Sequence, residues 1–282
     1  MHSAGEQRMP RRVRLGRAAL IAIAVVYVCA LVAVPAAALL HGAFSEGLGP
    51  FFQVFARPDV RHALSMTALM VFSAVVVNTV FGTAIAWVLT RDRFRGRRLL
   101  NGLVDVPFAI SPVIVGFVLL ELFGRQGLFT PVTRALGVQI AFAWPGMALA
   151  TTFVTLPFVV REVAPVLEEV GTEQEAAAHT LGASALVTFF RVTLPSIRWG
   201  LAYGITLTAA RSIGEFGAVL IISGGIAGRT ETATSFVYRA LEDRDDLGAH
   251  AVAVVLAVAS LALLGAMEML KRWRAGSRQV EE

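Results

Sequence analysis

The sequence predicts an all-α, polytopic membrane protein, and three observations lead to this fold class. Of its 282 residues, 56% are hydrophobic, and the mean hydropathy of +0.68 exceeds that of soluble domains. Six segments are long and apolar enough to cross a bilayer as helices. The apolar runs lack the alternation of a β-barrel, and open strands are excluded in lipid. The predicted spans are approximately 18–41, 63–90, 99–123, 141–161, 199–222 and 247–270.

The distribution of arginines predicts how these spans are oriented. Basic residues gather in the tail 1–17, in the turn 91–98 and after residue 270, and they alternate with less basic loops. By the positive-inside rule, both termini face the cytoplasm of a multi-pass protein in the plasma (inner) membrane. We therefore divide the chain into a basic cytoplasmic tail, 1–17, a six-helix transmembrane domain, 18–272, and a second cytoplasmic tail, 273–282.

Composition also excludes several functions. Cys29 is the only cysteine, so no internal disulfide and no thiolate metal site is expected. Lys271 is the only lysine and lies near the C-terminus, so the chain has no P-loop lysine and is not expected to hydrolyse ATP. The basic residues flank apolar spans, which favours a topological role over nucleic-acid binding. No catalytic residue, cofactor or metal site is predicted.

A turn, a span and a loop carry further signals. The turn 91–98 is interpreted as a topology determinant, with a lipid-headgroup or partner contact as the alternative. Pro107 and Pro112 interrupt the span 99–123, which indicates either a helix lining an interior path or a kinked packing helix. The loop 223–246 is interpreted as a solvated charged loop, although it offers a surface to an external partner.

The cytoplasmic loop 163–198 contains the most informative segment of the chain. Thr172 and Glu175 have the spacing of a capping box, which predicts a helix over 172–182. Glu173 and Glu175 suit the positive end of the helix dipole, and Ala176, Ala177 and Ala178 are strong helix formers. Gly182 fits the residue after the helix. Ser184 caps a second short helix, which Leu194 and Pro195 are expected to end. The small residues favour a docking surface for another protein, and a cover over the bundle is the alternative.

The same loop resembles that of the permeases of binding-protein-dependent ABC importers. Their loop has the form Glu-Ala-Ala-x-x-x-Gly, followed by an apolar-x-Leu-Pro end, and here Gly182, Val192 and Leu194-Pro195 match it. Ala177 and Ala178 hold the alanine positions. Ala176 stands where the family has glutamate, and Glu175 lies one residue earlier. This shift puts the contact of the family glutamate in doubt.

Other segments resemble the permeases of sulfate/thiosulfate importers, and more closely the second of the two permease types in that system. These segments, within about 55–270, are Val104–Gly127, Phe142–Met147, Leu156–Glu162, Leu181–Ser184, Arg191–Pro195 and Arg211–Ala218. The resemblance implies a type I importer permease fold, contact with membrane lipid and three kinds of protein partner. They are two ABC ATPase subunits, a second permease that is a related but distinct chain, and an extracytoplasmic sulfate-binding protein. Coupling to the ATPase is then expected at Glu173, Glu175, Ala176, Ala177, Ala178, Leu181, Gly182, Leu194 and Pro195.

Arg211 and Glu215 are costly charges inside a predicted span. Their spacing places them on one helix face, where they form either a self-neutralising structural pair or a gate on the translocation pathway. In the second interpretation Arg211 offers hydrogen-bond donors to a dianion. Ser212, Thr208 and Ser223 are candidate neutral donors on the same pathway.

Three alternatives compete with a sulfate/thiosulfate importer permease. Gly214–Gly217 is also typical of molybdate and tungstate permeases, so a permease for those oxyanions is the nearest alternative. A gradient-driven secondary transporter predicts inverted repeats and ion-coupling residues within the membrane, and no clear repeat is evident. A membrane anchor or sensor without transport needs neither broken spans nor a capped cytoplasmic loop.

Overall fold

The computed structural model describes residues 11–278, with side chains over 20–269. Within these residues the secondary structure is entirely helical. Residues 1–10 of the predicted tail 1–17 lie outside the described residues, and so do residues 279–282 of the predicted tail 273–282. The helices are α1 (Arg11–Phe44), α2 (Leu48–Val54), α3 (Pro58–Arg91), α4 (Arg97–Ala109), α5 (Pro112–Phe123), α6 (Thr130–Ala135), α7 (Trp144–Val170), α8 (Glu173–Thr180), α9 (Ala185–Thr188), the π-helical turn η1 (Phe189–Thr193), α10 (Leu194–Ile213), α11 (Gly217–Ser223), α12 (Ala233–Glu242) and α13 (Asp246–Arg278).

Four helices are individually long and apolar enough to cross a membrane, namely α1, α3, α7 and α13. Two further spans form if each of two bent helix pairs counts as one crossing: α4 with α5, and the run from α9 to α10 with α11. The six predicted spans therefore all correspond to helical segments, and the all-α prediction is confirmed.

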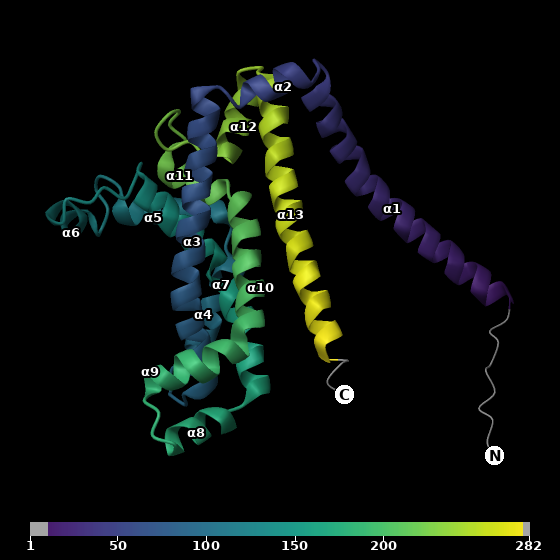
Figure 1. Ribbon diagram of the computed structural model, residues 1–282. Helices are drawn as coiled ribbons and strands as arrows, with labels where there is room; N and C mark the ends of the chain where they lie inside the picture. Colours follow the sequence, from purple (N-terminus) through teal and green to yellow (C-terminus); the bar gives the residue numbers. More distant parts are fainter. Residues whose placement is uncertain (1–10, 279–282) are drawn as a thin grey trace.

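The core of the bundle is the packing of α3, α7 and α10 (Figure 1). Glycines permit this close approach, because a Cβ on Gly82 would lie 2.8 Å from the Val159 side chain. A Cβ on Gly204 would likewise lie 2.9 Å from the Val159 backbone. Small residues at helix contacts are the usual means by which membrane helices pack without a hydrophobic driving force.

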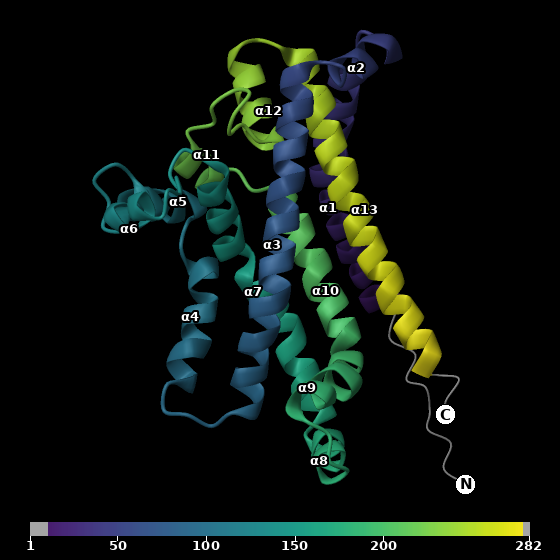
Figure 2. The ribbon, with the colours of Figure 1, turned by 60° about the vertical axis from the view of Figure 1, so that its left-hand side comes forward.

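The two ends of the bundle differ. The short helices α8 and α9 cover one end, and α2 and α12 lie at the other (Figures 1 and 2). The helix α1 begins, and α13 ends, toward the α8 end, as an even number of crossings requires. The basic turn between α3 and α4 lies at this end too (Figure 2). The helix α1 leans away from the bundle along most of its length, and its apolar side chains are exposed.

Two predicted spans are broken instead of continuous. The span 99–123 divides into α4 and α5, and the direction of the chain bends by 110° between them. The break arises because Pro112 cannot continue the helix that ends at Ala109. The span 199–222 bends by 59° between α10 and α11, at Gly214, Glu215 and Phe216. Such breaks persist at membrane depth only where protein or water satisfies the freed backbone groups.

The interpretation of 223–246 as a solvated loop is wrong. Thr232 caps α12 through its hydroxyl, and Phe236 on that helix is fully buried. Arg239 lies 2.6 Å from the buried carboxylate of Glu231 and 3.6 Å from Asp59 at the start of α3. The hydrogen bond that Arg239 donates to Glu231, together with a further one to Asp243, raises the pKa of Arg239 above its usual value. The apolar face of α12 and this ion-pair network order the segment, which charge count alone did not reveal.

Candidate functional site

The loop between α7 and α10 forms a compact, protruding element. The helix α7 ends at Val170, and Gly171 then adopts a φ of 68°. The helix α8 ends near Gly182, whose φ of 84° is the left-handed conformation expected after a helix. A side chain at Gly182 would meet no atom within 4 Å, so only the backbone conformation favours glycine there. The predicted helix and its glycine stop are therefore confirmed.

The predicted capping box at Thr172 does not form. The Thr172 side chain makes no capping hydrogen bond, and its backbone is near the helical region, with φ −112° and ψ −1°. The Glu175 carboxylate instead turns inward and binds a guanidinium group. A charge-assisted, bidentate hydrogen bond is stronger than a bond to one backbone N–H, which accounts for the exchange of partners. Ser184, by contrast, caps α9 as expected, accepting from the Val187 N–H at 3.4 Å.

Arg91, the last residue of α3, is the partner of Glu175. Its Nε and Nη2 donate to Glu175 at 3.0 and 3.1 Å, and the two side chains are only 10% and 12% exposed. The same guanidinium donates to the backbone oxygens of Leu167 and Gly171 at the end of α7, at 2.9 and 2.7 Å. The Thr193 hydroxyl donates to Glu175 at 2.9 Å. One arginine thus joins α3, α7, α8 and η1.

Sequence reasoning missed this role, because Arg91 was grouped with the basic turn 91–98. The available signal was its position at the end of an apolar run, ahead of the exposed turn. The orientation of Glu175 is relevant to the one-residue shift of the Glu-Ala-Ala motif. Glu175 points into the protein, whereas Glu173 and Ala176 are exposed on α8.

The exposed face of this loop consists of large apolar side chains beside small residues. Leu181 is 88% exposed, and Leu186, Val187 and Phe190 are exposed beside it. Ala177 is exposed and Ala178 is half-buried. An exposed apolar cluster on a rigid loop is typical of a protein-docking site. We call Ala176, Ala177, Leu181, Gly182, Leu186 and Phe190 the loop face.

Leu194 and Pro195 do not end the second helix, contrary to expectation. The helical run continues from α9 through η1 into α10. In the π-helical turn, the Leu194 N–H bonds to the Phe189 oxygen, which shifts the hydrogen-bond register immediately before the proline. Leu194 packs against the core of α3, α7 and α10, and Pro195 is exposed.

Arg211 and Glu215 form the expected ion pair, with 2.8 Å between Nη1 and Oε2. They do not share a helix face, however, because α10 ends at Ile213 and Glu215 lies in the break before α11. The Glu215 side chain is 2% exposed, and that of Arg211 is 34% exposed. Glu215 also accepts from the Ala218 N–H at 3.2 Å, and its backbone oxygen accepts from Thr234 at 2.7 Å. The pair is therefore built into the bend between the helices.

Of the neutral candidates, Thr208 and Ser212 lie in the last turns of α10 before the bend, whereas Ser223 lies at the far end of α11. Ser212 is buried and donates to the Thr208 backbone oxygen at 2.7 Å. Ser223 accepts from the Gly225 N–H at 3.1 Å, so its hydroxyl is also engaged. A second polar link, which the sequence did not indicate, joins α4 to α7: Arg161 binds Asp105 at 2.9 and 2.6 Å. Among the described residues there is no group of three or more acidic, histidine or cysteine side chains that could hold a metal ion.

The described residues thus form a bundle of up to six membrane-spanning segments, two of them broken, with a partly buried ion pair at one break and an exposed apolar loop at one end. A solved permease assembly supports this fold. A bacterial alginate ABC transporter in complex with an alginate-bound periplasmic protein superposes with a TM-score of 0.75 at 15% identity, covering 93% of this chain and 95% of that one.

The model of the family described as binding-protein-dependent transport system inner membrane component matches residues 78–275. The chain belongs to this family. It is an inner membrane permease component and not an enzyme, as the sequence predicted.

Curated relatives cover nearly the whole chain. It is 47% identical over 253 residues to the sulfate transport system permease protein CysW of Synechocystis, covering 90% of this chain and 92% of that protein. The CysT permease of the same organism is 36% identical over 251 residues, covering 89% and 88%. Sulfate permease 2 of the Chlamydomonas reinhardtii chloroplast is 49% identical over 245 residues, which is 87% of this chain but only 66% of that protein. The predicted likeness to the second permease type is confirmed.

Proposed function

We propose that this chain is the transmembrane permease subunit of an ATP-driven importer that moves sulfate or thiosulfate into the cytoplasm. The observation that carries the proposal is the 47% identity to a sulfate transport permease over 90% of this chain and 92% of that relative. The two broken spans and the rigid loop supply the structural features that such a permease needs. No feature of the described structure favours molybdate, tungstate or a gradient-driven mechanism over this assignment.

The proposed partners follow from the family and from exposed surfaces. Two ATPase subunits hydrolyse ATP, and one of them receives the 172–182 helix of this chain at the loop face. The other ATPase engages a second, related permease. An extracytoplasmic sulfate-binding protein delivers the anion at the α2 and α12 end. Lipid or the second permease covers the apolar exposed side of α1.

This arrangement requires that both termini and the loop 163–198 face the cytoplasm. The basic turn 91–98 and the loop face lie at one end, where α1 begins and α13 ends (Figures 1 and 2). The positive-inside rule favours the cytoplasm for that end. On this basis we propose 1–17 and 273–282 as cytoplasmic tails and 18–272 as the transmembrane domain.

The geometry suggests how ATP-driven motion reaches the pathway. The ATPase moves α8, and the Arg91–Glu175 contact passes that motion to the ends of α3 and α7. Both helices pack against α10, which ends at Arg211 and the bend. A rigid-body switch of this kind needs a stiff link from the partner to the moving helices. We propose that Arg211, Ser212 and Glu215 form the polar element of the pathway at the bend, where partly exposed Arg211 offers donors to the passing dianion.

The proposal is tested by sulfate uptake in a strain that lacks this permease and is complemented with the gene. The matched variant is Gly182→Asp, because a side chain there meets no atom of this chain and places charge on the loop face. The left-handed backbone conformation at this position should lower the folding stability of the aspartate variant by roughly 1 kcal/mol, which is too little to unfold the protein.

We expect uptake with the wild-type gene, and loss of uptake with Gly182→Asp while membrane levels are unchanged. Excess thiosulfate should compete with sulfate. Unaffected sulfate uptake in the deletion strain, with molybdate uptake lost instead, would replace the substrate assignment with molybdate.

A further inference from the structure

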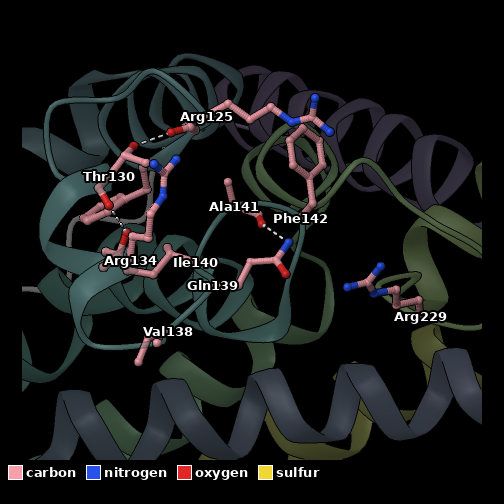
Figure 3. A pocket seen from close by; sticks show the side chains of 13 residues that line it. Arg125, Thr130, Arg134, Val138, Gln139, Ile140, Ala141, Phe142 and Arg229 are labelled. Carbon is pink, nitrogen blue, oxygen red and sulfur yellow. Dashed lines mark hydrogen bonds between the residues drawn. The ribbon is translucent and has the colours of Figure 1, made fainter.

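A hollow lined by three arginines shares no residue with the loop face or with the Arg211–Glu215 pair. Its walls are the loop after α5, helix α6, the loop before α7 and the loop between α11 and α12, and its volume is about 540 Å³ (Figure 3). Arg125 comes from the first of these segments, Arg134 from α6 and Arg229 from the last. Figure 3 shows the three side chains on different sides of the hollow.

No carboxylate of the described residues lines this hollow, although Glu121 lines an adjoining one together with Arg125. Within the described residues, none of the three guanidinium groups forms an ion pair, unlike Arg57, Arg91, Arg161, Arg211 and Arg239. The segment 124–140 contains no acidic residue. An arginine remains charged at any physiological pH. The hollow therefore holds three permanent positive charges in a loop region that, in the proposed orientation, faces away from the cytoplasm.

The loop before α7 is held in place and carries backbone strain. Phe142 adopts a φ of 58°, a left-handed conformation that costs a non-glycine residue about 1–2 kcal/mol. Its N–H nevertheless donates to the Ile222 oxygen at 2.9 Å, which ties the loop to α11. The Gln139 amide donates to the Ala141 oxygen at 3.1 Å within the same loop. Strain maintained by surrounding contacts is typical of a binding site.

We propose that Arg125, Arg134 and Arg229 form a low-affinity binding site for a tetrahedral oxyanion of the sulfate class, which occupies the site on its way from the binding protein to the pathway. The proposal rests on the proposed function. Guanidinium groups are well suited to such anions, because they donate paired hydrogen bonds to two oxygens. Three of them, from separate segments, line this one hollow.

The shape of the site favours a small anion over an acidic protein surface. A hollow of about 540 Å³ lies in the range of small-ligand pockets, at about 300–1,000 Å³. A stable protein contact needs about 800 Å² per partner and a broad surface. Because the three arginines are exposed to solvent, they are expected to bind the anion weakly. Weak binding suits a site that the anion occupies only in passing, since a tight site would retain it.

The test uses the complete transporter in lipid nanodiscs, without the binding protein, and measures labelled sulfate by equilibrium dialysis. We expect wild-type protein to bind sulfate at millimolar concentration. Arg125→Gln, Arg134→Gln and Arg229→Gln should each weaken this binding by about tenfold or more, for the loss of one charge-assisted hydrogen bond. The matched control is Arg244→Gln, an exposed arginine outside the hollow, which should bind sulfate like the wild type.

A second measurement needs no variant. Phenylglyoxal modifies accessible arginines, and peptide mass spectrometry locates the products. Sulfate should protect Arg125, Arg134 and Arg229 in the wild-type complex, whereas chloride at equal ionic strength should not. Equal protection of Arg244, or protection by chloride, would overturn the proposal in favour of general screening.

Two outcomes separate this inference from the proposed function. If the wild-type complex transports sulfate but the three variants bind and transport it normally, the site is wrong and the function stands. If the variants lose affinity for the binding protein while free sulfate binding is unchanged, the hollow is a protein-docking site, which also overturns the proposal. If the wild type transports no sulfate but molybdate competes for the hollow, the substrate assignment fails and the oxyanion site stands.

Discussion

Arg91 at the end of α3 holds Glu175 of α8 by two hydrogen bonds, at 3.0 and 3.1 Å, across 84 positions of sequence. Two further N–H groups of the guanidinium, on Nη1 and Nη2, donate to the Leu167 and Gly171 oxygens at the end of α7. The loop face is therefore fixed to the transmembrane helices by a charged and largely buried contact. A force applied to α8 passes directly to α3 and α7.

Replacing Arg91 with methionine should both destabilise and uncouple the transporter. Removal of one partner of a buried ion pair costs about 3–5 kcal/mol. We expect a lower Tm of the solubilised complex, and ATP hydrolysis that continues without sulfate uptake. Glu175→Gln, which keeps a hydrogen-bond acceptor for Arg91 and Thr193, should have a smaller effect on both. An Arg91→Met complex with wild-type uptake would contradict the role of this contact.

Leu181 gives a direct test of the loop face, because its side chain is 88% exposed and contributes little to this chain's own packing. We expect Leu181→Asp to leave the Tm of the isolated permease unchanged and to abolish copurification of the ATPase. Leu241→Asp is the control, since Leu241 is also exposed but lies on α12 at the other end. Equal ATPase binding by both variants would show that docking occurs elsewhere.

Arg211→Ala separates the two interpretations of the ion pair at the bend. The side chain of Arg211 is partly exposed, whereas the Glu215 carboxylate is buried and also caps α11. Arg211→Ala leaves the buried Glu215 carboxylate unpaired, so the Tm should fall. We nevertheless expect the complex to assemble and sulfate uptake to drop by about tenfold or more, as loss of a charge-assisted bond to the anion predicts. Loss of the protein from the membrane, with recovery in Arg211→Ala/Glu215→Gln, would instead assign the pair a structural role.

Arg239 should stabilise the end opposite the loop face. It neutralises Glu231, a carboxylate with almost no exposure, at 2.6 Å, and contacts Asp59 and Asp243 as well. Arg239→Gln leaves that carboxylate buried and unpaired, so unfolding should become easier by about 3–5 kcal/mol. Thermal unfolding of the purified complex measures the change. Because Arg239→Gln/Glu231→Gln removes the unpaired charge, its Tm should lie above that of the single variant.

The sequence predicted the elements that depend on local chemistry. Apolar length located all six spans, and the positions of Gly182 and Ser184 correctly marked the end of α8 and the start of α9. It did not predict how far the prolines and Gly214 break the spans, because the angle at a break is set by packing against other helices. Pro112 produced a bend of 110°, whereas Pro157 and Pro165 are accommodated within α7.

The contacts between distant segments were beyond reach of the same reasoning. Thr172 and Glu175 have the spacing of a capping box, yet Glu175 binds Arg91 instead, because that stronger partner arrives from α3. The hollow is a similar case, since Arg125, Arg134 and Arg229 are brought together only by the packing of α5 against α11. The helices, the loop face and the Arg211–Glu215 pair involve residues near in sequence, whereas the Arg91–Glu175 contact and the hollow join residues that are distant in sequence.

In the proposed function, this chain imports sulfate and receives the force for import through the loop face. The most direct measurement is ATP-dependent accumulation of labelled sulfate in proteoliposomes that hold the complete transporter and its binding protein. We predict accumulation against a gradient with the wild-type chain and none with Gly182→Asp, although both complexes contain equal amounts of permease. Equal accumulation by the two would contradict coupling at the loop face, and the absence of sulfate accumulation by an intact wild-type complex would contradict the proposed function itself.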